Sequence, residues 1–256
     1  RAGGPAPPAG VCLRALVRNR RDDLVAFFDH YRAMGVQHFV FIDNGSTDDT
    51  IERIKAEPGT VIDQCPLPLA RYEDLIRQYP AKTYGQNRWC LYVDMDEMFD
   101  FEGRGQVGLP GLVAYLEAQG YTALVAQMLE MFPKAPLSET AYLSYPQALE
   151  DFRYFDISAL KRFDYHSPEI PFSALLEDNE LADEGVQFLF GGVRGKVFGE
   201  DCCLTKHPLI FNGPGVTPAP HPHLSQGVRV AEVTAGHKHY KADRIERGRA
   251  RGENSW

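Results

Sequence analysis

Asp94, Asp96 and Glu97 are three carboxylates that directly follow the apolar residues 89–93. Ionised carboxylates are costly away from water, so a buried strand does not end in three of them for the sake of packing. Asp94 and Asp96 alternate along an extended chain, and both side chains can then point to the same side. Oxygen ligands of this kind suit Mg²⁺ or Mn²⁺. The stretch indicates a divalent-cation site, with a solvated acidic turn as the alternative.

A second polar turn follows the apolar residues 39–42 and begins with Asp43. An Asp at a strand end, facing a helix N-terminus, can accept hydrogen bonds from a base or a ribose. Ser46 and Asp49 have the spacing of a capping box, which predicts that a helix starts there. Alone, the turn would be read as a capped turn, the commoner use of Asn, Gly and Ser. Two such strand ends in one chain favour a ligand site.

These turns require a sheet that brings them to one edge. We expect buried strands over 11–17, 39–42, 60–64 and 89–93. Helices alternate with them, beginning at Asp22-Asp23, after the Asp43 turn and near residue 71. Such alternation predicts a parallel sheet with right-handed crossovers, and ligands of such sheets bind at the carboxyl ends of the strands.

The pattern becomes mixed after residue 101. We expect a helix over 109–119, a long strand within 121–132 and a strand over 202–211, whereas 138–156 is ambiguous. The remaining stretches are predicted to be an acidic surface loop or short helices over 168–185, a loop over 213–222 and a basic helix or tail over 242–251.

The composition is ordinary for a soluble globular protein, with 44% hydrophobic and 24% charged residues among 256. A net charge of -8 argues against binding to nucleic acid polymers. The five cysteines form no Cys-x-x-Cys pair, and free thiols fit a reducing compartment. No apolar run has the length of a membrane span. We expect a cytoplasmic protein, and peripheral association with the inner membrane stays open.

The chain resembles the family 2 glycosyltransferases, in the bacterial branch with DN-STD and DxDE motifs. The resemblance covers about residues 11–101 and rests on Arg18-Asn19-Arg20, Gly35-Val36-Gln37-His38-Phe39, Asp43-Asn44-Gly45-Ser46-Thr47-Asp48, and Trp89 with Asp94-Met95-Asp96-Glu97. It implies an α/β chain of GT-A fold, the nucleotide-diphospho-sugar transferase fold, with a mostly parallel central sheet flanked by helices. Residues 1–10 would be a flexible tail, 11–101 the nucleotide-sugar-binding half, and 102–256 a mixed α+β acceptor-side half of the same domain with a basic C-terminal segment.

The resemblance also implies an activity: metal-dependent, inverting transfer of a sugar from a nucleotide-sugar donor, with Mn²⁺ or Mg²⁺ as cofactor. It favours a UDP-sugar as donor and a bacterial glycan, a lipid-linked molecule or a protein as acceptor. Asp43 would contact the nucleoside, and Asp94 and Asp96 would hold the ribose and the metal diphosphate. Further donor contacts are implied for Arg18, Asn19, Asn44 and Ser46. One departure is Arg20, where the family usually has an acid.

Later parts of the chain carry weaker similarities. His239 and Lys241 resemble an H-F-K stretch, which implies a third metal ligand and a phosphate contact, with an exposed basic turn as the alternative. We expect His239 to fold back beside Asp96. Arg194, Lys196 and Lys206 lie in basic segments that recur in similar chains and would contact phosphate or sugar. For the glycine-rich segment around Arg194, the alternative is a β-hairpin turn with solvated charges.

Inverting transfer needs a carboxylate that deprotonates the acceptor hydroxyl. The segment around Asp178 resembles the family's "ED.EL" motif, so Asp178 is the candidate base and Asp156 the reserve. The processive "Q..RW" signature is absent, which favours a single addition over polymer synthesis.

Two other functions stay open. A sugar-phosphate nucleotidyltransferase shares a related core, but it would need a glycine-rich phosphate loop after the first strand, where this chain has Arg18-Asn19-Arg20-Arg21. A non-catalytic module that binds a nucleotide or sugar is compatible with Arg20, although intact metal carboxylates argue against it.

Overall fold

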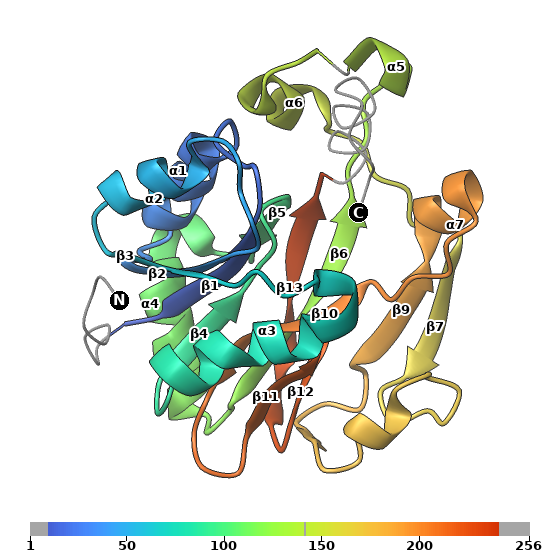
Figure 1. Cartoon of the computed structure of the whole chain (residues 1–256). Coiled ribbons are helices and arrows are strands. Elements are labelled where there is room, and N and C mark those ends of the chain that lie inside the picture. Colours follow the sequence, from blue (N-terminus) through green and yellow to red (C-terminus); the bar gives the residue numbers. More distant parts are fainter. Residues whose placement is uncertain (1–9, 141, 241–256) are drawn as a thin grey trace.

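The computed structural model describes residues 10–140 and 142–240 (Figure 1). The predicted flexible tail, except Gly10, lies outside these residues. Lys241 and the predicted basic segment 242–251 also lie outside them.

A nine-stranded sheet forms the centre of the described chain, in the order β3-β2-β1-β4-β10-β6-β13-β5, with β8 paired to β13. Its strands are β1 Cys12–Val17, β2 His38–Asp43, β3 Thr60–Gln64, β4 Trp89–Tyr92, β5 Glu97–Asp100, β6 Ala123–Glu130, β8 Glu180–Leu181, β10 Thr205–Phe211 and β13 Arg229–His239. Two smaller pairs are β7 Leu160–Asp164 with β9 Gln187–Gly191, and β11 Thr217–His221 with β12 Leu224–Gln226.

The first four strands are parallel neighbours, as the sequence predicts. The sheet becomes mixed where β10 runs antiparallel to both β4 and β6, and where β5 runs antiparallel to β13. Although β4 and β5 are consecutive in the chain, β10, β6 and β13 lie between them. The two halves of the chain therefore share one sheet. The predicted α/β class, with a mostly parallel central sheet flanked by helices, is confirmed.

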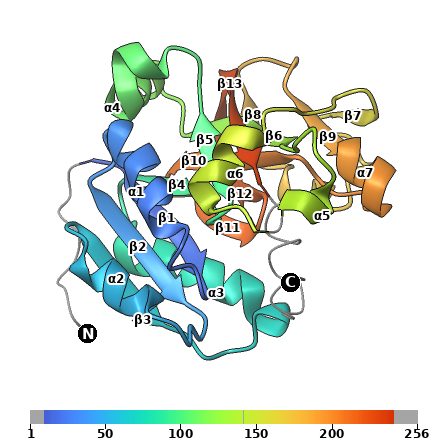
Figure 2. The same ribbon diagram turned by 90° about the horizontal axis from the view of Figure 1, so that it is seen from above.

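The helices are α1 Leu24–Ala33, α2 Thr50–Ala56, α3 Leu69–Tyr84, α4 Arg104–Ala118, α5 Leu137–Thr140, α6 Tyr145–Asp151 and α7 Gly192–Phe198, with a short 3-10 helix at Ser173–Leu175. Figure 1 shows α3 crossing the front of the sheet, and Figure 2 shows α6 from above, near β5 and β13. No helix of the described residues is long and apolar enough to cross a membrane.

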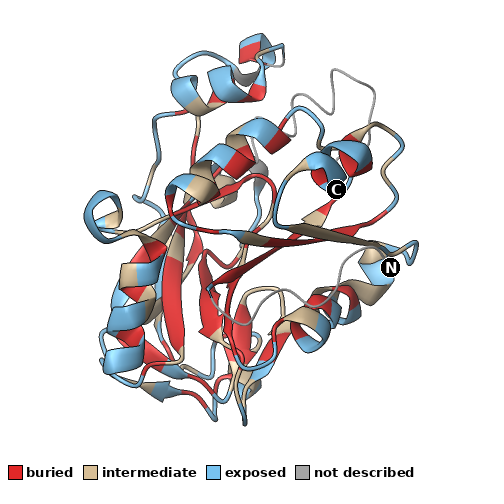
Figure 3. Cartoon of the chain, turned by 90° about the vertical axis from the view of Figure 1, so that its left-hand side faces the viewer, coloured by how far each residue is buried: buried red, intermediate tan, exposed pale blue. Residues whose placement is uncertain are grey.

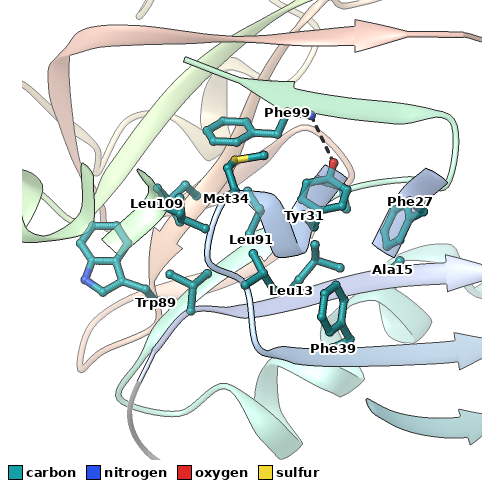
Figure 4. Close-up of a cluster of buried hydrophobic side chains, with 14 of the residues drawn as sticks. Leu13, Ala15, Phe27, Tyr31, Met34, Phe39, Trp89, Leu91, Phe99 and Leu109 are labelled. Atoms are coloured by element: carbon teal, nitrogen blue, oxygen red, sulfur yellow. Dashed lines mark hydrogen bonds between the residues drawn. The ribbon is translucent and has the colours of Figure 1, made fainter. Parts of the chain in front are cut away.

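The main core lies between the sheet and α1 with α4. Alternation along β1 turns Leu13 toward this face, where it packs with Phe27 and Tyr31 of α1 and with Leu109 of α4 (Figure 4). The helical spacing of the α1 residues places their apolar side chains on one side. In Figure 3 the strands are largely buried, whereas the outer sides of the helices are exposed. On the opposite face, α3 packs beside the β11–β12 pair.

Two local predictions and one alternative are wrong. The capping box of Ser46 and Asp49 is not formed, because α2 begins only at Thr50 and Ser46 bonds to another loop. The hairpin turn, which is the alternative for the glycine-rich segment 191–199, is not formed either: the segment contains the helix α7, and Gly199 caps it with a left-handed φ of 70°. The predicted loop 213–222 contains the strand β11, which pairs with β12.

Tyr31 joins α1 to β5 at the base of the carboxylate turn. Its side chain is fully buried, and its hydroxyl donates to the carbonyl oxygen of Glu97 at 2.8 Å. The Tyr31 hydroxyl oxygen in turn accepts a hydrogen bond from the backbone N–H of Phe99 at 3.2 Å (Figure 4). One side chain thus satisfies two buried backbone groups.

We predict that Tyr31→Phe lowers the free energy of unfolding by about 1–3 kcal/mol, because two buried backbone groups lose their partner. Urea denaturation measures the change. Tyr115→Phe is the matched control, since the hydroxyl of Tyr115 contacts Glu232 at the exposed surface, and it should cost less than about 0.5 kcal/mol. Equal losses in the two variants would contradict the role given to Tyr31.

Candidate functional site

The carboxylates that follow β4 lie in a tight turn. The backbone N–H of Glu97 donates to the carbonyl oxygen of Asp94 at 3.1 Å, so the chain reverses between β4 and β5. Asp94 and Asp96 are therefore the first and third residues of a turn. The sequence predicts instead that they alternate along an extended chain, and this prediction is wrong. Their carboxylates face different partners.

Asp94 faces two cations from other elements. The Arg77 side chain on α3 donates from Nη1 to Oδ1 at 2.9 Å and from Nη2 to Oδ2 at 3.4 Å. The Lys206 Nζ on β10 lies 3.8 Å from Oδ2. Burial alone would raise the pKa of Asp94, but Arg77 and Lys206 together outweigh it and lower the pKa below its ordinary value. Asp94 is consequently ionised at neutral pH.

Glu97 is almost completely buried and still carries a charge. Its carboxylate forms an ion pair with Lys206 and accepts a hydrogen bond from the backbone N–H of Asp94 at 3.0 Å. The ring of His237, also fully buried, lies 3.4 Å away. Burial opposes the charge, but Lys206 and then His237 hold the pKa of Glu97 well below its ordinary value. The Lys206 ammonium therefore serves two carboxylates of one turn.

The structure places His239 beside Asp96, as expected. The last residues of β13 pair with β5, which sets His239 opposite Glu97. As a result the His239 Nε2 lies 3.8 Å from the Asp96 Oδ2, and the backbone N–H of Tyr240 donates to the Asp96 carbonyl oxygen. Both side chains are less than a tenth exposed. Helix α6 packs over this end, where Tyr145 contacts the Tyr240 ring.

The other ring nitrogen of His239 is held by Glu130 on β6, 2.7 Å away. Glu130 in turn lies 3.5 Å from the Arg194 guanidinium on α7. Burial alone would lower the pKa of His239, but the nearby carboxylates, Glu130 first and then Asp96 and Glu97, together outweigh it, and the pKa is raised. Glu130 therefore orients the ring with Nε2 toward Asp96.

Asp96 and His239 fit a divalent cation better than Asp94 does. A metal-binding His usually donates its other ring N–H to a carboxylate, which is the position of Glu130 relative to His239. Both carboxylate oxygens of Asp94 instead accept hydrogen bonds from Arg77. In the part of the chain that is described, no three His, Cys, Asp or Glu side chains are grouped as a metal site. Asp96 and His239 would need ligand oxygens to complete a shell.

The loops after β1 and β2 are bonded to each other at the same edge. Asp43 is buried and accepts the backbone N–H groups of Gly45 and Ser46 within its own turn. Ser46 accepts the backbone N–H of Asn19 at 2.9 Å, and Asn19 accepts that of Thr47 at 2.8 Å. These bonds give the loops a fixed shape. Whether Asn19, Asp43 and Ser46 also contact a donor stays a prediction.

Asn44, Arg18 and Arg20 complete this edge. Asn44 donates to the carbonyl oxygens of Cys65 and Leu67 at 2.8 Å each, which anchors the loop before α3. Arg18 is exposed at the end of β1. Arg20 pairs with Asp23 at 2.8 Å. Burial alone would lower the pKa of Arg20, but the negative charges of Asp23 and Asp96 raise it. A cation thus faces the turn from the first loop.

Two predicted groups, Arg194 and Lys196, lie on α7 and not in the turn. Arg194 lies 3.5 Å from Glu130, which contacts His239. Lys196 pairs with Asp156 at 2.8 Å on the exposed side of α7. The hydrogen bond from Lys196 lowers the pKa of Asp156, which makes this reserve base a weaker proton acceptor.

The structure does not bring Asp178 to the turn. Asp178 is exposed and lies two residues before Glu180, which pairs with Arg229 at the start of β13. His239 is at the other end of that strand, and at about 3.3 Å per residue the two ends are roughly 30 Å apart. On this geometry, the candidate base Asp178 lies far from Asp96 and His239. The similarity of the segment around Asp178 to a family motif does not indicate at which end of the sheet Asp178 lies.

Sequence reasoning missed Arg77 and Glu130. Arg77 lies on α3 with Glu73 one helical turn before it, a pattern that is typical of any exposed helix. Glu130 ends a strand without a recognisable motif. The sequence places Glu97 among the carboxylates of the predicted cation site, whereas in the structure Glu97 pairs with Lys206. The pairing of Arg77 with Asp94 and of Glu130 with His239 follows only from the folded chain, which brings these residues together from distant parts of the sequence.

Neither a scan against models of protein families nor a search of curated proteins finds a match to this chain.

We predict that Lys206→Met lowers the free energy of unfolding by about 3–5 kcal/mol, because it leaves the Glu97 charge buried and unpaired. Lys161→Met is the control: its ion pair with Asp201 is more than half exposed and should be worth at most about 1 kcal/mol. Urea denaturation compares the two. Adding Glu97→Gln to Lys206→Met should recover part of the loss, and the absence of any recovery would refute this pairing.

Acid should weaken the fold through Glu97. A group whose native pKa is depressed contributes stability that is fully present above its unfolded-state pKa, here the ordinary value of 4.5, and is lost as the pH falls toward the native pKa. We expect the free energy of unfolding to decrease below about pH 5, and less steeply in Glu97→Gln. Parallel slopes in denaturation series from pH 7 to pH 3 would contradict this.

Proposed function

We propose that the protein is a metal-dependent, inverting glycosyltransferase of GT-A fold that adds single sugars from a nucleotide-diphosphate donor. The observation that carries the proposal is the meeting of Asp96 and His239 at 3.8 Å, from separate parts of the chain, beside the Asp94 turn. This meeting lies at the edge where the parallel strands β1, β2 and β4 end. Ligands of open α/β sheets bind at that edge.

In this proposal Asp96 and His239 hold Mn²⁺ or Mg²⁺, and the diphosphate oxygens supply further ligands. The cation, when bound, offsets the negative charge that develops on the leaving diphosphate. Glu130 keeps the His239 ring in the tautomer that presents Nε2. Asp94 remains with Arg77 and is suited to accept a hydrogen bond from the donor ribose rather than to bind the metal.

The donor's nucleoside would lie between the loops after β1 and β2. Asn19 and Ser46 tie these loops together, so their shape is set before a donor arrives. The proposal keeps Asp43, Asn44 and Arg18 as neighbours of the nucleoside. A UDP-sugar is the donor that the family resemblance favours, and a bacterial glycan, lipid-linked molecule or protein is the acceptor.

Titration calorimetry tests the proposal. We expect UDP to bind only when Mn²⁺ or Mg²⁺ is present. Asp96→Asn and His239→Ala should each weaken this binding at least about tenfold, and Glu130→Gln about tenfold, because the ring loses its orientation. Asp178→Asn is the control and should bind as the native protein does, since Asp178 lies at the far end of β13.

Three outcomes would redirect the proposal. No metal-dependent binding of any nucleoside diphosphate would refute it. Binding without metal-dependent release of UDP from UDP-sugars would favour a non-catalytic module. Release of pyrophosphate from a nucleoside triphosphate and a sugar phosphate would favour a nucleotidyltransferase.

A further inference from the structure

A pocket lies on the face of the sheet that α3 and the β11–β12 pair cover. Its walls are mostly apolar and come from four regions, represented by Leu16 on β1, Ile76 on α3, Ala219 on β11 and Leu224 on β12. Charged side chains also line it, namely Arg14, Arg77, Asp94, Glu97 and Lys206. Small-molecule sites have this composition: apolar walls with a few polar groups that fix the orientation of the ligand.

The charges in this pocket do not cancel. Arg77 is paired with Asp94, and Lys206 is paired with Glu97. Arg14 remains as a third cation. Its neighbours on β4 are the hydroxyl of Tyr92 and the thiol of Cys90, each 3.0 Å from a guanidinium nitrogen. Neither of the described residues that Arg14 bonds to is a carboxylate.

The neighbours of Arg14 are neutral at physiological pH. Burial raises the pKa of the Cys90 thiol to about 11 and also raises the pKa of Tyr92. Arg14 itself is only 3% exposed, and its Nε has no hydrogen-bond partner among the described residues. A buried charge without an anionic partner is costly.

The backbone makes room for this guanidinium. A Cβ atom at Gly85, which follows α3, would lie 1.3 Å from the Arg14 Nη2, so only glycine is compatible with the position of Arg14. Arg14 pairs with Tyr92 in the register of β1 and β4, two residues before Asp94. The unpaired cation therefore lies deeper in the sheet than the Asp94 turn.

We propose that this pocket binds a small organic anion, whose carboxylate or phosphate group pairs with Arg14 and whose apolar body contacts Leu16, Ile76 and Leu224. The proposal does not rest on glycosyl transfer, because Arg14 has no part in the contacts of Asp96 and His239, but the pocket also includes Asp94, which the proposed function places beside the donor ribose. An oxyanion suits the site because a guanidinium donates two parallel hydrogen bonds to it. The apolar walls favour an organic body over a hydrated inorganic ion.

Thermal unfolding of the full chain with three probes tests the inference: benzoate, phenyl phosphate and inorganic phosphate, each against sodium chloride of equal ionic strength. A hundredfold excess over Kd should raise the Tm of the native protein by about 5–10 °C for at least one organic probe. Arg14→Met, which keeps the length of the side chain without its charge, should abolish the shift. Its Tm in chloride should equal or exceed that of the native protein, since a buried unpaired charge has been removed.

The matched control is Arg88→Met. Arg88 is also a buried arginine with unpaired nitrogens, but it does not line the pocket, so its variant should retain the full shift. Arg14→Lys keeps the charge with one donor group and should keep part of the shift. Benzoate and phenyl phosphate separate carboxylate from phosphate ligands.

Several results would overturn the inference. One is the absence of any shift beyond chloride in the native protein; another is an equal shift in Arg14→Met. A response to inorganic phosphate alone would also overturn it, because the apolar walls would then have no role. If Arg14→Met does not fold, a crystal structure of the native protein with phenyl phosphate decides, since its phosphoryl oxygens must lie within hydrogen-bond distance of Arg14.

Discussion

The buried ion pair between Glu97 and Lys206 is the interaction on which the site depends. Glu97 begins β5, Lys206 lies on β10, and β6 and β13 separate these strands in the sheet. The backbone of Glu97 is held by Tyr31 from α1, and its carboxylate holds the backbone of Asp94. One carboxylate thus fixes the turn after β4, and through that turn the directions of Asp94 and Asp96.

Around this pair the structure alternates charges. Arg77 faces Asp94, His239 lies between Asp96 and Glu130, and Arg194 lies beyond Glu130. Asp96, Glu97 and Glu130 each have a basic neighbour from a different element, so their desolvation is offset only when the strands are in register. The pocket at Arg14 differs, because the described residues to which Arg14 donates hydrogen bonds, Tyr92 and Cys90, are not carboxylates.

The arrangement also explains how the two halves of the chain cooperate. Strands β1, β2 and β4 deliver three polar loops to one edge, and β13 returns to that edge from the far end of the described chain. Because β13 is 11 residues long, its two ends serve different places: Arg229 pairs near Glu180, whereas His239 reaches Asp96. A residue's position relative to this strand decides whether it can take part in the site.

The sequence by itself determined the first four strands, their parallel pairing, and the loops of Asp43 and Asp94 at their carboxyl ends, because apolar runs and turn residues act over a few neighbours. The family resemblance added His239 beside Asp96. Only the tertiary structure decided that Arg77 forms an ion pair with Asp94 and that Glu130 orients His239. It also decided that Asp178 and His239 lie near opposite ends of β13. Those outcomes depend on strand order and register, in which residues far apart in the chain are brought together, and no local pattern encodes that pairing.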